Sequence, residues 1–234
     1  MARLKLVCLP FAGAGIAPFW SWPRALPASI ELYAAQLPGR EDRLREPALD
    51  TFAEMHAALI DAIAKLPPGP LALFGHSMGA VMALEVARVL CAAASPRVTH
   101  VMCAARPWPG VGSGDFADLA SIDDDDRFID ALARRYGVRN AALDDRELRA
   151  LALPALRADL RLLADYRWQP ASPLTCPLTV YSGKDDPITR EADMRLWQRE
   201  SAAAFDHVQI AGRHFFLDTH KQALIDDISA RLCG

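Results

Sequence analysis

The sequence predicts an α/β fold, in which a mainly parallel sheet carries helices on both faces. Short apolar runs of strand length alternate along the chain with longer segments of helical periodicity. Strands separated by helices form parallel sheets that are covered on both sides. The length of 234 residues also suits one α/β domain, because such domains commonly extend to roughly 250 residues.

The first predicted strand is Leu4–Leu9, an apolar run that precedes a glycine-rich turn at residues 12–15. A helix is expected to begin at Pro18. The second strand is predicted at Ile30–Leu37, where the sequence Pro38-Gly39 ends the apolar run. The alternation of strand and helix therefore begins close to the N-terminus.

The next helix is predicted at Thr51–Leu66, because apolar residues recur there at helical spacing. Either Asp50 or Thr51 is its N-cap, and the run Pro67-Pro68-Gly69-Pro70 ends it. Three elements follow in order, a short buried strand, a long helix and another strand: Leu71–Phe74, Met78–Ala94 and Val98–Ala104.

The segment Asp115–Trp168 interrupts this alternation, because it contains no strand-like run. It predicts two or three helices, one after Asp123–Asp126 and one around Asp144–Arg167 that is interrupted at Pro154. A helical insertion between two strands predicts a lid over one edge of the sheet, at approximately residues 115–168. The last elements are two strands and a helix: Pro177–Tyr181, Phe205–Ile210 and Lys221–Leu232.

The composition argues against several other classes of protein. The formal net charge is −3, whereas a general nucleic-acid-binding protein carries a basic stripe. No run approaches the ~20 apolar residues of a membrane helix, and the N-terminal apolar run, broken by Lys5, is too short for a signal peptide. The cysteines are odd in number and form no CxxC pair: Cys8, Cys91, Cys103, Cys176 and Cys233. Free thiols are typical of a reducing compartment, so we expect a cytoplasmic protein.

The sequence Gly75-His76-Ser77-Met78-Gly79 lies between a predicted strand and a predicted helix. This is the context of the G-x-S-x-G nucleophile elbow, a strained turn that lifts a serine hydroxyl above the sheet. The two glycines let neighbouring backbone approach the turn, and the helix start provides N–H groups where negative charge develops. Ser77 is therefore predicted to be a catalytic nucleophile.

A serine nucleophile needs a general base, and a carboxylate must orient that base. After such an elbow the acid comes first along the chain and the histidine second. His214 directly follows the last predicted strand, where a loop returns to the elbow. The other histidines lie within or near other elements: His56, His76, His100, His207 and His220. His214 is therefore the predicted base.

The acid is predicted in the loop after Pro177–Tyr181, which contains both Asp185 and Asp186. The earlier strand Val98–Ala104 leads into Ala105-Arg106-Pro107-Trp108 and has no acid near its end. Position alone does not choose between the two aspartates.

The second oxyanion donor is expected from the turn Pro10–Gly15, because glycines let the backbone face a reacting carbonyl. There the N–H of Ala12, or that of Phe11, would bind the oxyanion together with the N–H of Met78. The same turn lacks the third glycine of a dinucleotide-binding loop, and no HExxH, P-loop or paired Cys/His spacing occurs. Neither a cofactor nor a metal is therefore expected.

Five stretches resemble the type II thioesterases, the editing hydrolases that accompany polyketide and nonribosomal peptide synthetases and have the α/β-hydrolase fold. They are Leu9-Pro10-Phe11-Ala12-Gly13, Gln36-Leu37-Pro38-Gly39-Arg40-Glu41-Asp42-Arg43, Leu153-Pro154-Ala155-Leu156-Arg157-Ala158-Asp159, Gly183-Lys184-Asp185-Asp186 and Gly212-Arg213-His214-Phe215-Phe216. They follow the family's order and span nearly the whole chain. The chain departs from the family at Arg213, where glycine is usual, and at Ala14-Gly15, where Gly-Ser is common.

The resemblance implies that Asp186 is the triad acid and that the Ala12 and Met78 N–H groups hold the oxyanion. It implies a serine thioesterase that removes aberrant or stalled acyl groups from the phosphopantetheine arm of acyl or peptidyl carrier proteins. Candidates for contact with the acyl group are leucines of the lid: Leu151, Leu156, Leu160 and Leu163. Candidates for docking an acidic carrier protein are two arginine clusters: Arg40, Arg43 and Arg45, and Arg134, Arg135 and Arg139. We expect a monomer that binds neither nucleic acid nor membrane.

Three other functions share part of this pattern. A general carboxylesterase would use the same triad and differ in preferring oxyesters. A product-releasing or medium-chain fatty acyl thioesterase would act on finished chains. A binding module would keep the fold without catalysis, and the intact Ser77, His214 and acid pair argue against it.

Overall fold

The computed structural model describes residues 3–93, 98–112, 115–136 and 143–234. Within these residues six strands form one sheet in the order β2-β1-β3-β4-β5-β6, and all neighbouring strands are parallel. The strands are β1 (Leu4–Leu9), β2 (Ile30–Ala34), β3 (Leu71–His76), β4 (Val98–Ala104), β5 (Leu178–Gly183) and β6 (Phe205–Ile210). The predicted α/β fold with a mainly parallel sheet is therefore confirmed.

The order of the strands reverses between β1 and β3. From β1 the chain first moves outward to β2, and from β3 it moves in the opposite direction through β4 and β5 to β6. In open parallel sheets, ligands bind at the carboxyl ends of the strands beside such a reversal. The turns that follow β1 and β3 are therefore the expected position of a functional site.

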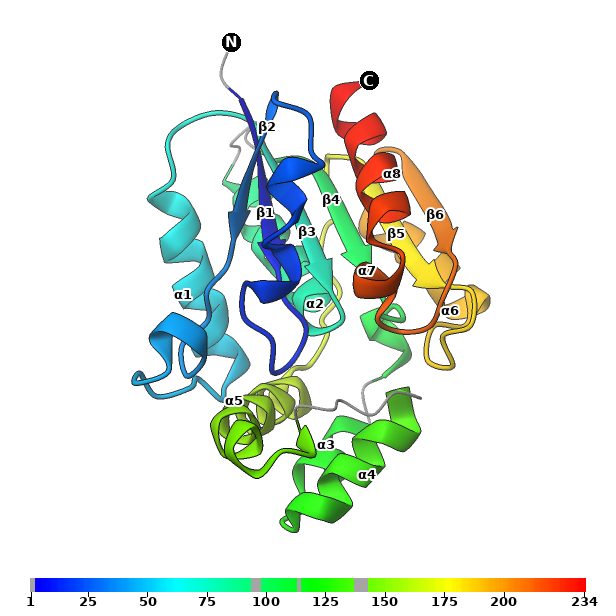
Figure 1. Ribbon diagram of the computed structural model, residues 1–234. Coiled ribbons are helices and arrows are strands. Elements are labelled where there is room, and N and C mark those ends of the chain that lie inside the picture. Colours follow the sequence, from blue (N-terminus) through cyan, green and yellow to red (C-terminus); the bar gives the residue numbers. More distant parts are fainter. Residues whose placement is uncertain (1–2, 94–97, 113–114, 137–142) are drawn as a thin grey trace.

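Helices cover both faces of the sheet, because alternate side chains of each strand point to opposite faces. Leu73 and Phe74, which are consecutive in β3, belong to different hydrophobic cores. The core around Leu73 includes α1 (Phe52–Ala64) and α2 (Met78–Ala92), and the core around Phe74 includes α8 (Lys221–Cys233). Figure 1 shows α2 behind the sheet and α8 in front of it.

The predicted insertion between β4 and β5 contains helices in its described part, and Figure 1 shows them beyond the carboxyl ends of the strands. They are α3 (Asp115–Ala120), α4 (Asp125–Tyr136) and α5 (Arg146–Asp165). The predicted interruption at Pro154 is wrong, because α5 continues through it. Proline removes one helical hydrogen bond, but Leu153 and Leu160, on either side of it, are buried and hold the helix in place.

The prediction of a helix from Pro18 is also wrong, because two short 3-10 helices lie there instead, η1 (Ala17–Phe19) and η2 (Trp22–Arg24). Pro23 has no N–H to continue an α-helix. Thr51, one of two predicted N-caps, caps α1: its hydroxyl oxygen accepts a hydrogen bond from the Glu54 N–H at 3.4 Å. This is half of a capping box.

The remaining short elements are η3 (Glu41–Arg43), η4 (Pro109–Val111), α6 (Glu191–Arg195), η6 (Leu196–Glu200) and α7 (Phe216–Thr219). All five cysteines are free thiols. None of the helices in the described residues is both long and apolar enough to cross a lipid bilayer.

Candidate active site

Ser77 stands between β3 and α2 in a backbone conformation that side chains rarely adopt, with φ 55° and ψ −105°. The turn needs glycine on both sides of it. A Cβ at Gly75 would lie 1.9 Å from the Gly79 carbonyl oxygen, and a Cβ at Gly79 would lie 2.2 Å from the Leu9 carbonyl oxygen. The Ser77 N–H donates to the Ala104 carbonyl at 2.8 Å, which holds the turn against β4.

His214 and Asp186 form a hydrogen-bonded pair in the loops after β6 and β5. Nδ1 of His214 lies 3.0 Å from Oδ2 of Asp186, and both side chains are buried. The other oxygen, Oδ1, accepts a hydrogen bond from the Ile188 N–H at 3.0 Å. Asp185 is exposed, and only its backbone N–H is used in this loop, on the Gly212 carbonyl. The structure therefore brings Asp186, and not Asp185, to the imidazole.

The environment of Asp186 keeps its carboxyl group ionised. Burial raises the pKa of Asp186, but the hydrogen bond and charge of His214, together with the Ile188 N–H, bring that pKa below its ordinary value. An ionised carboxylate can only accept hydrogen bonds, so Nδ1 of His214 carries the proton in this pair. Nε2 is then free to accept a proton on the other side of the ring.

Ser77 and His214 line the same cavity, whose volume is about 590 Å³. In the described part of the chain no hydrogen bond joins their side chains. Such contacts are often long in the absence of substrate and tighten when it binds. The ring of Tyr136, at the end of α4, lies 4.6 Å from the ring of His214 between their centroids, so α4 reaches the site.

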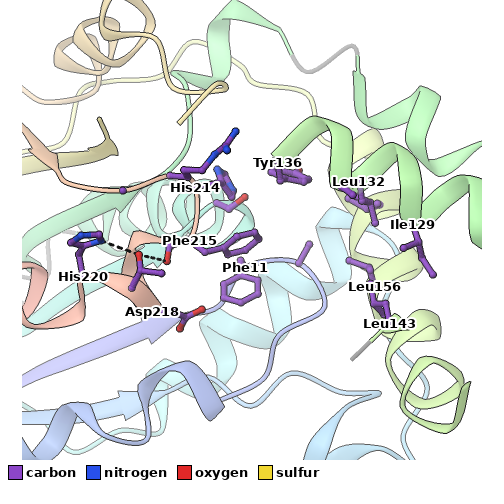
Figure 2. A pocket seen from close by; sticks show the side chains of 17 residues that line it. Phe11, Ile129, Leu132, Tyr136, Leu143, Leu156, His214, Phe215, Asp218 and His220 are labelled. Carbon is purple, nitrogen blue, oxygen red and sulfur yellow. Dashed lines mark hydrogen bonds between the residues drawn. The ribbon is translucent and has the colours of Figure 1, made fainter. Parts of the chain in front are cut away.

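The cavity has an apolar end and a polar end. Figure 2 shows leucine and isoleucine side chains from the insertion on one side, Asp218 and His220 on the other, and Phe11 and Phe215 between them. The apolar lining residues from the insertion include Ile129, Leu132, Leu143, Leu156 and Leu160. A ligand with one hydrocarbon end and one polar end fits this division.

The turn after β1 supplies the other wall of the site. Ala12 lines the cavity, and Met78 is the first residue of α2, so its N–H has no partner within the helix. The next residue, Gly13, donates its N–H to Oδ2 of Asp159 at 2.7 Å. Asp159 in turn pairs with Arg40 through two hydrogen bonds, of 2.5 and 2.8 Å.

The family model of the thioesterase domain matches residues 4–232. This chain belongs to the thioesterase family. It is 33% identical over 232 residues to the thioesterase PikA5 of Streptomyces venezuelae, and the aligned region covers 99% of this chain and 82% of PikA5. It is 31% identical over 226 residues to the thioesterase TesA of Mycobacterium marinum, with coverages of 95% and 88%. A solved structure of the type II thioesterase BorB from the borrelidin biosynthetic cluster has a TM-score of 0.88 and 32% identity, over 98% of this chain and 93% of that one.

The resemblance carried by the five sequence stretches is thereby confirmed, and the protein is a thioesterase, a hydrolase of thioester bonds. Three of those stretches meet in space. Arg40 comes from the stretch 36–43 and Asp159 from the stretch 153–159, and they pair beside Gly13 of the first stretch. The sequence pattern marks all three stretches but does not indicate this pair, because the contact joins residues 119 positions apart.

One arginine of the clusters predicted to dock a carrier protein is not available at the surface. Arg40 is 4% exposed and pairs with Asp159, so it is not available to a partner. Arg43 pairs with Glu46 at the surface, whereas Arg45 and Arg134 are exposed. Arg135 lies over the ring of Phe116, and Arg139 falls outside the described residues.

The predicted acyl-contacting leucines also divide into two groups. Leu156 and Leu160 line the cavity. Leu163 is buried in the core, and Leu151 is 51% exposed. Leu156 and Leu160 are four residues apart and so share one face of α5, while Leu151 points to another face.

His76, within the elbow, is a buried imidazole for which the sequence pattern indicates no catalytic role. Neither of its ring nitrogens has a hydrogen-bond partner among the described residues. Its ring centroid lies 5.5 Å from that of His214 and 5.7 Å from that of Phe11. Burial, and then the nearby His214, hold the pKa of His76 well below its ordinary value. His76 therefore stays neutral and packs against the ring of His214.

Proposed function

We propose that this thioesterase hydrolyses acyl thioesters on the phosphopantetheine arm of acyl or peptidyl carrier proteins, and so clears aberrant or stalled acyl groups from polyketide or nonribosomal peptide assembly. The observation that carries the proposal is the hydrogen bond between His214 and Asp186 beside the cavity that Ser77 lines. The pathway is supported by relatives such as BorB, a type II thioesterase from the borrelidin biosynthetic cluster.

In the proposed reaction, Ser77 Oγ attacks the carbonyl carbon of the thioester while Nε2 of His214 takes the hydroxyl proton. Asp186 holds the His214 ring through Nδ1 and stabilises its positive charge. The N–H groups of Met78 and Ala12 donate hydrogen bonds to the carbonyl oxygen and stabilise the negative charge that develops on it.

The C–S bond then breaks, and His214 returns its proton to the departing sulfur. The thiol of the arm needs little help to leave, because a cysteine-like thiol has a pKa near 8.5. A water molecule then gives a proton to His214 and attacks the acyl carbon. The bond between that carbon and Ser77 Oγ breaks, and His214 returns the proton to Oγ. The products are a free acid, the free arm and Ser77 with its hydroxyl restored.

The two ends of the cavity support an orientation of the substrate. The acyl chain lies against the apolar side chains of α4 and α5, including Leu132, Leu156 and Leu160. The polar arm lies toward Asp218 and His220. In this arrangement residues 115–168 act as a lid on a single α/β-hydrolase domain that spans residues 1–234.

The test is a panel of acyl groups loaded on carrier proteins, with release followed by intact mass. Ser77→Ala is expected to abolish release while circular dichroism and thermal unfolding remain unchanged. Ser229→Ala, on α8 and outside the cavity lining, is the matched control and is expected to turn over normally. Undiminished release by Ser77→Ala would refute the mechanism.

The same panel separates the alternatives. Equal rates on oxyesters and on carrier-bound thioesters would indicate a general carboxylesterase. A strong preference for medium-length or finished chains over short ones would indicate product release in place of editing.

We further propose that the thioesterase acts in the cytoplasm as a monomer. The five free thiols are compatible with a reducing compartment. Light scattering coupled to gel filtration tests the monomer, and a mass near twice 25.6 kDa would overturn it.

A further inference from the structure

The carboxylate of Asp159 joins three segments that are far apart in the sequence. It is fully buried and accepts hydrogen bonds from both terminal nitrogens of Arg40, at 2.5 and 2.8 Å, and from the Gly13 N–H at 2.7 Å. Nη1 of Arg40 also donates to the Ala14 carbonyl at 3.3 Å. The peptide groups that follow Ala12 are thus held on one side by α5 and on the other by Arg40.

We propose that Asp159 and Arg40 are positioning residues, which set the direction of the Ala12 N–H and make the oxyanion hole depend on the placement of α5. The inference rests on the proposed function, in which Ala12 is an oxyanion donor. The Gly13 N–H belongs to the peptide group between Ala12 and Gly13. Holding that group constrains Ala12, which lines the cavity and whose N–H the proposed function places in the oxyanion hole.

Stability alone is a poor explanation for this buried ion pair. Removing two charges from water is costly, and replacing a buried pair by apolar side chains of similar size is often neutral or stabilising. An apolar pair would fill the space between α5 and residue 40. It would offer no acceptor to the Gly13 N–H, and that acceptor is the contribution that only the carboxylate makes.

The same face of α5 also contacts the acyl end of the cavity. Leu156 lies three residues before Asp159, close to one turn of helix, and it lines the cavity. Its Cδ1 lies 3.1 Å from the position that a Cβ on Gly13 would occupy. A shift of α5 therefore moves the wall of the acyl site and the turn that bears Ala12 together.

The decisive variant combines Arg40→Met with Asp159→Leu, which removes both charges and keeps an apolar filling. We expect it to fold, with a Tm close to that of the native protein. The kcat is expected to fall about 10- to 100-fold at nearly unchanged KM, since losing one oxyanion donor entirely costs about 10²–10³-fold in kcat. Arg161→Met is the matched control on α5, because among the described residues it breaks the exposed contact with Asp50 and no other polar contact. It is expected to leave both constants unchanged.

Three readouts keep the inference separate from the proposed function. They are hydrolysis of a short-chain p-nitrophenyl ester, hydrolysis of an acyl carrier thioester, and the rate at which a fluorophosphonate labels Ser77. Activity of the native protein on the ester but not on the carrier thioester would refute the proposed partner and leave the positioning test intact. Native kcat and labelling rate in the folded double variant would overturn the inference, as would an equal loss in Arg161→Met.

A second variant keeps the inference testable in case the double variant does not fold. Arg40→Lys keeps a positive charge opposite Asp159 but not the two-pronged hydrogen bonding of the guanidinium. It is expected to lower kcat to a smaller extent at unchanged KM, and native kcat in this variant would overturn the inference.

Discussion

Replacing Asp186 by asparagine is expected to leave the protein folded and to remove nearly all of its activity. The Ile188 N–H, which now donates to Oδ1 at 3.0 Å, keeps its acceptor if the amide oxygen takes that position. The amide nitrogen then occupies the position of Oδ2, 3.0 Å from Nδ1 of His214. Because an amide nitrogen only donates, Nδ1 must accept, and the ring proton moves to Nε2.

The position of the proton on the His214 ring determines how much activity this variant loses. With Nε2 protonated, His214 cannot take the proton of Ser77, and a substitution of this kind in a serine–histidine–aspartate triad lowers kcat by about 10⁴-fold. This corresponds to about 5.4 kcal/mol at 1.36 kcal/mol for each factor of ten. The shape of the side chain is unchanged, so the loss appears in kcat and not in Tm.

The assay is release of an acyl group from a carrier protein, with kcat and KM measured separately. Asp185→Asn is the matched control, because this neighbouring side chain is exposed and surface substitutions change stability by about 0.5 kcal/mol or less. It is expected to keep native activity. Native kcat in Asp186→Asn, or a large loss in Asp185→Asn, would refute the assignment of the acid and the tautomer argument together.

Three further perturbations test other parts of the structure. Gly79→Ala places a methyl group 2.2 Å from the Leu9 carbonyl oxygen, so we expect loss of phosphonate labelling at the elbow and a lower Tm; native labelling would contradict the close approach. Burial lowers the pKa of His100 to about 4. Between about pH 6.5 and 4 the unfolded chain therefore binds a proton that the folded protein excludes. As the pH is lowered through this range, the free energy of unfolding decreases by up to ~1.4 kcal/mol per pH unit. In urea titrations His100→Gln should make this slope shallower, and equal slopes would contradict the burial argument. Charge reversal of the exposed Arg45 and Arg134 should slow turnover of carrier-bound substrate and spare a small thioester; equal rates on both would remove the docking hypothesis.

The sheet and the elbow could be predicted from the sequence because their signals are local. The apolar run of β3, the two glycines and the start of α2 are contiguous, and only glycine fits where Gly75 and Gly79 contact neighbouring backbone. The position of His214 followed from the order of elements in this fold. These features need no knowledge of contacts between distant segments.

The rest depended on contacts that sequence position does not encode. Asp185 and Asp186 are adjacent, and only the turn after β5 decides which of them is buried beside the imidazole. Pro154 predicts a break on local grounds, but burial of α5 on both sides overrides it. Arg40 belonged to a basic cluster in the sequence, and its burial against Asp159 became visible only in three dimensions.

The two helices that flank the acyl end of the cavity are attached to the rest of the protein by different contacts. Near its end α5 is fastened by the ion pair of Asp159 and by the hydroxyl of Tyr166, which follows the helix and donates to Glu85 at 2.7 Å. The start of α4 is joined to α5 through carboxylates that are 51% and 79% exposed, those of Asp125 and Asp126, and exposed pairs contribute only about 0–1 kcal/mol. The packing of α4 is made by Phe128 and Ile129, which are buried in the core, and Tyr136 at its end lies 4.6 Å from the ring of His214 between their centroids. Both walls of the acyl end therefore reach the catalytic residues, α5 through the turn at Gly13 and α4 through the ring of the catalytic base.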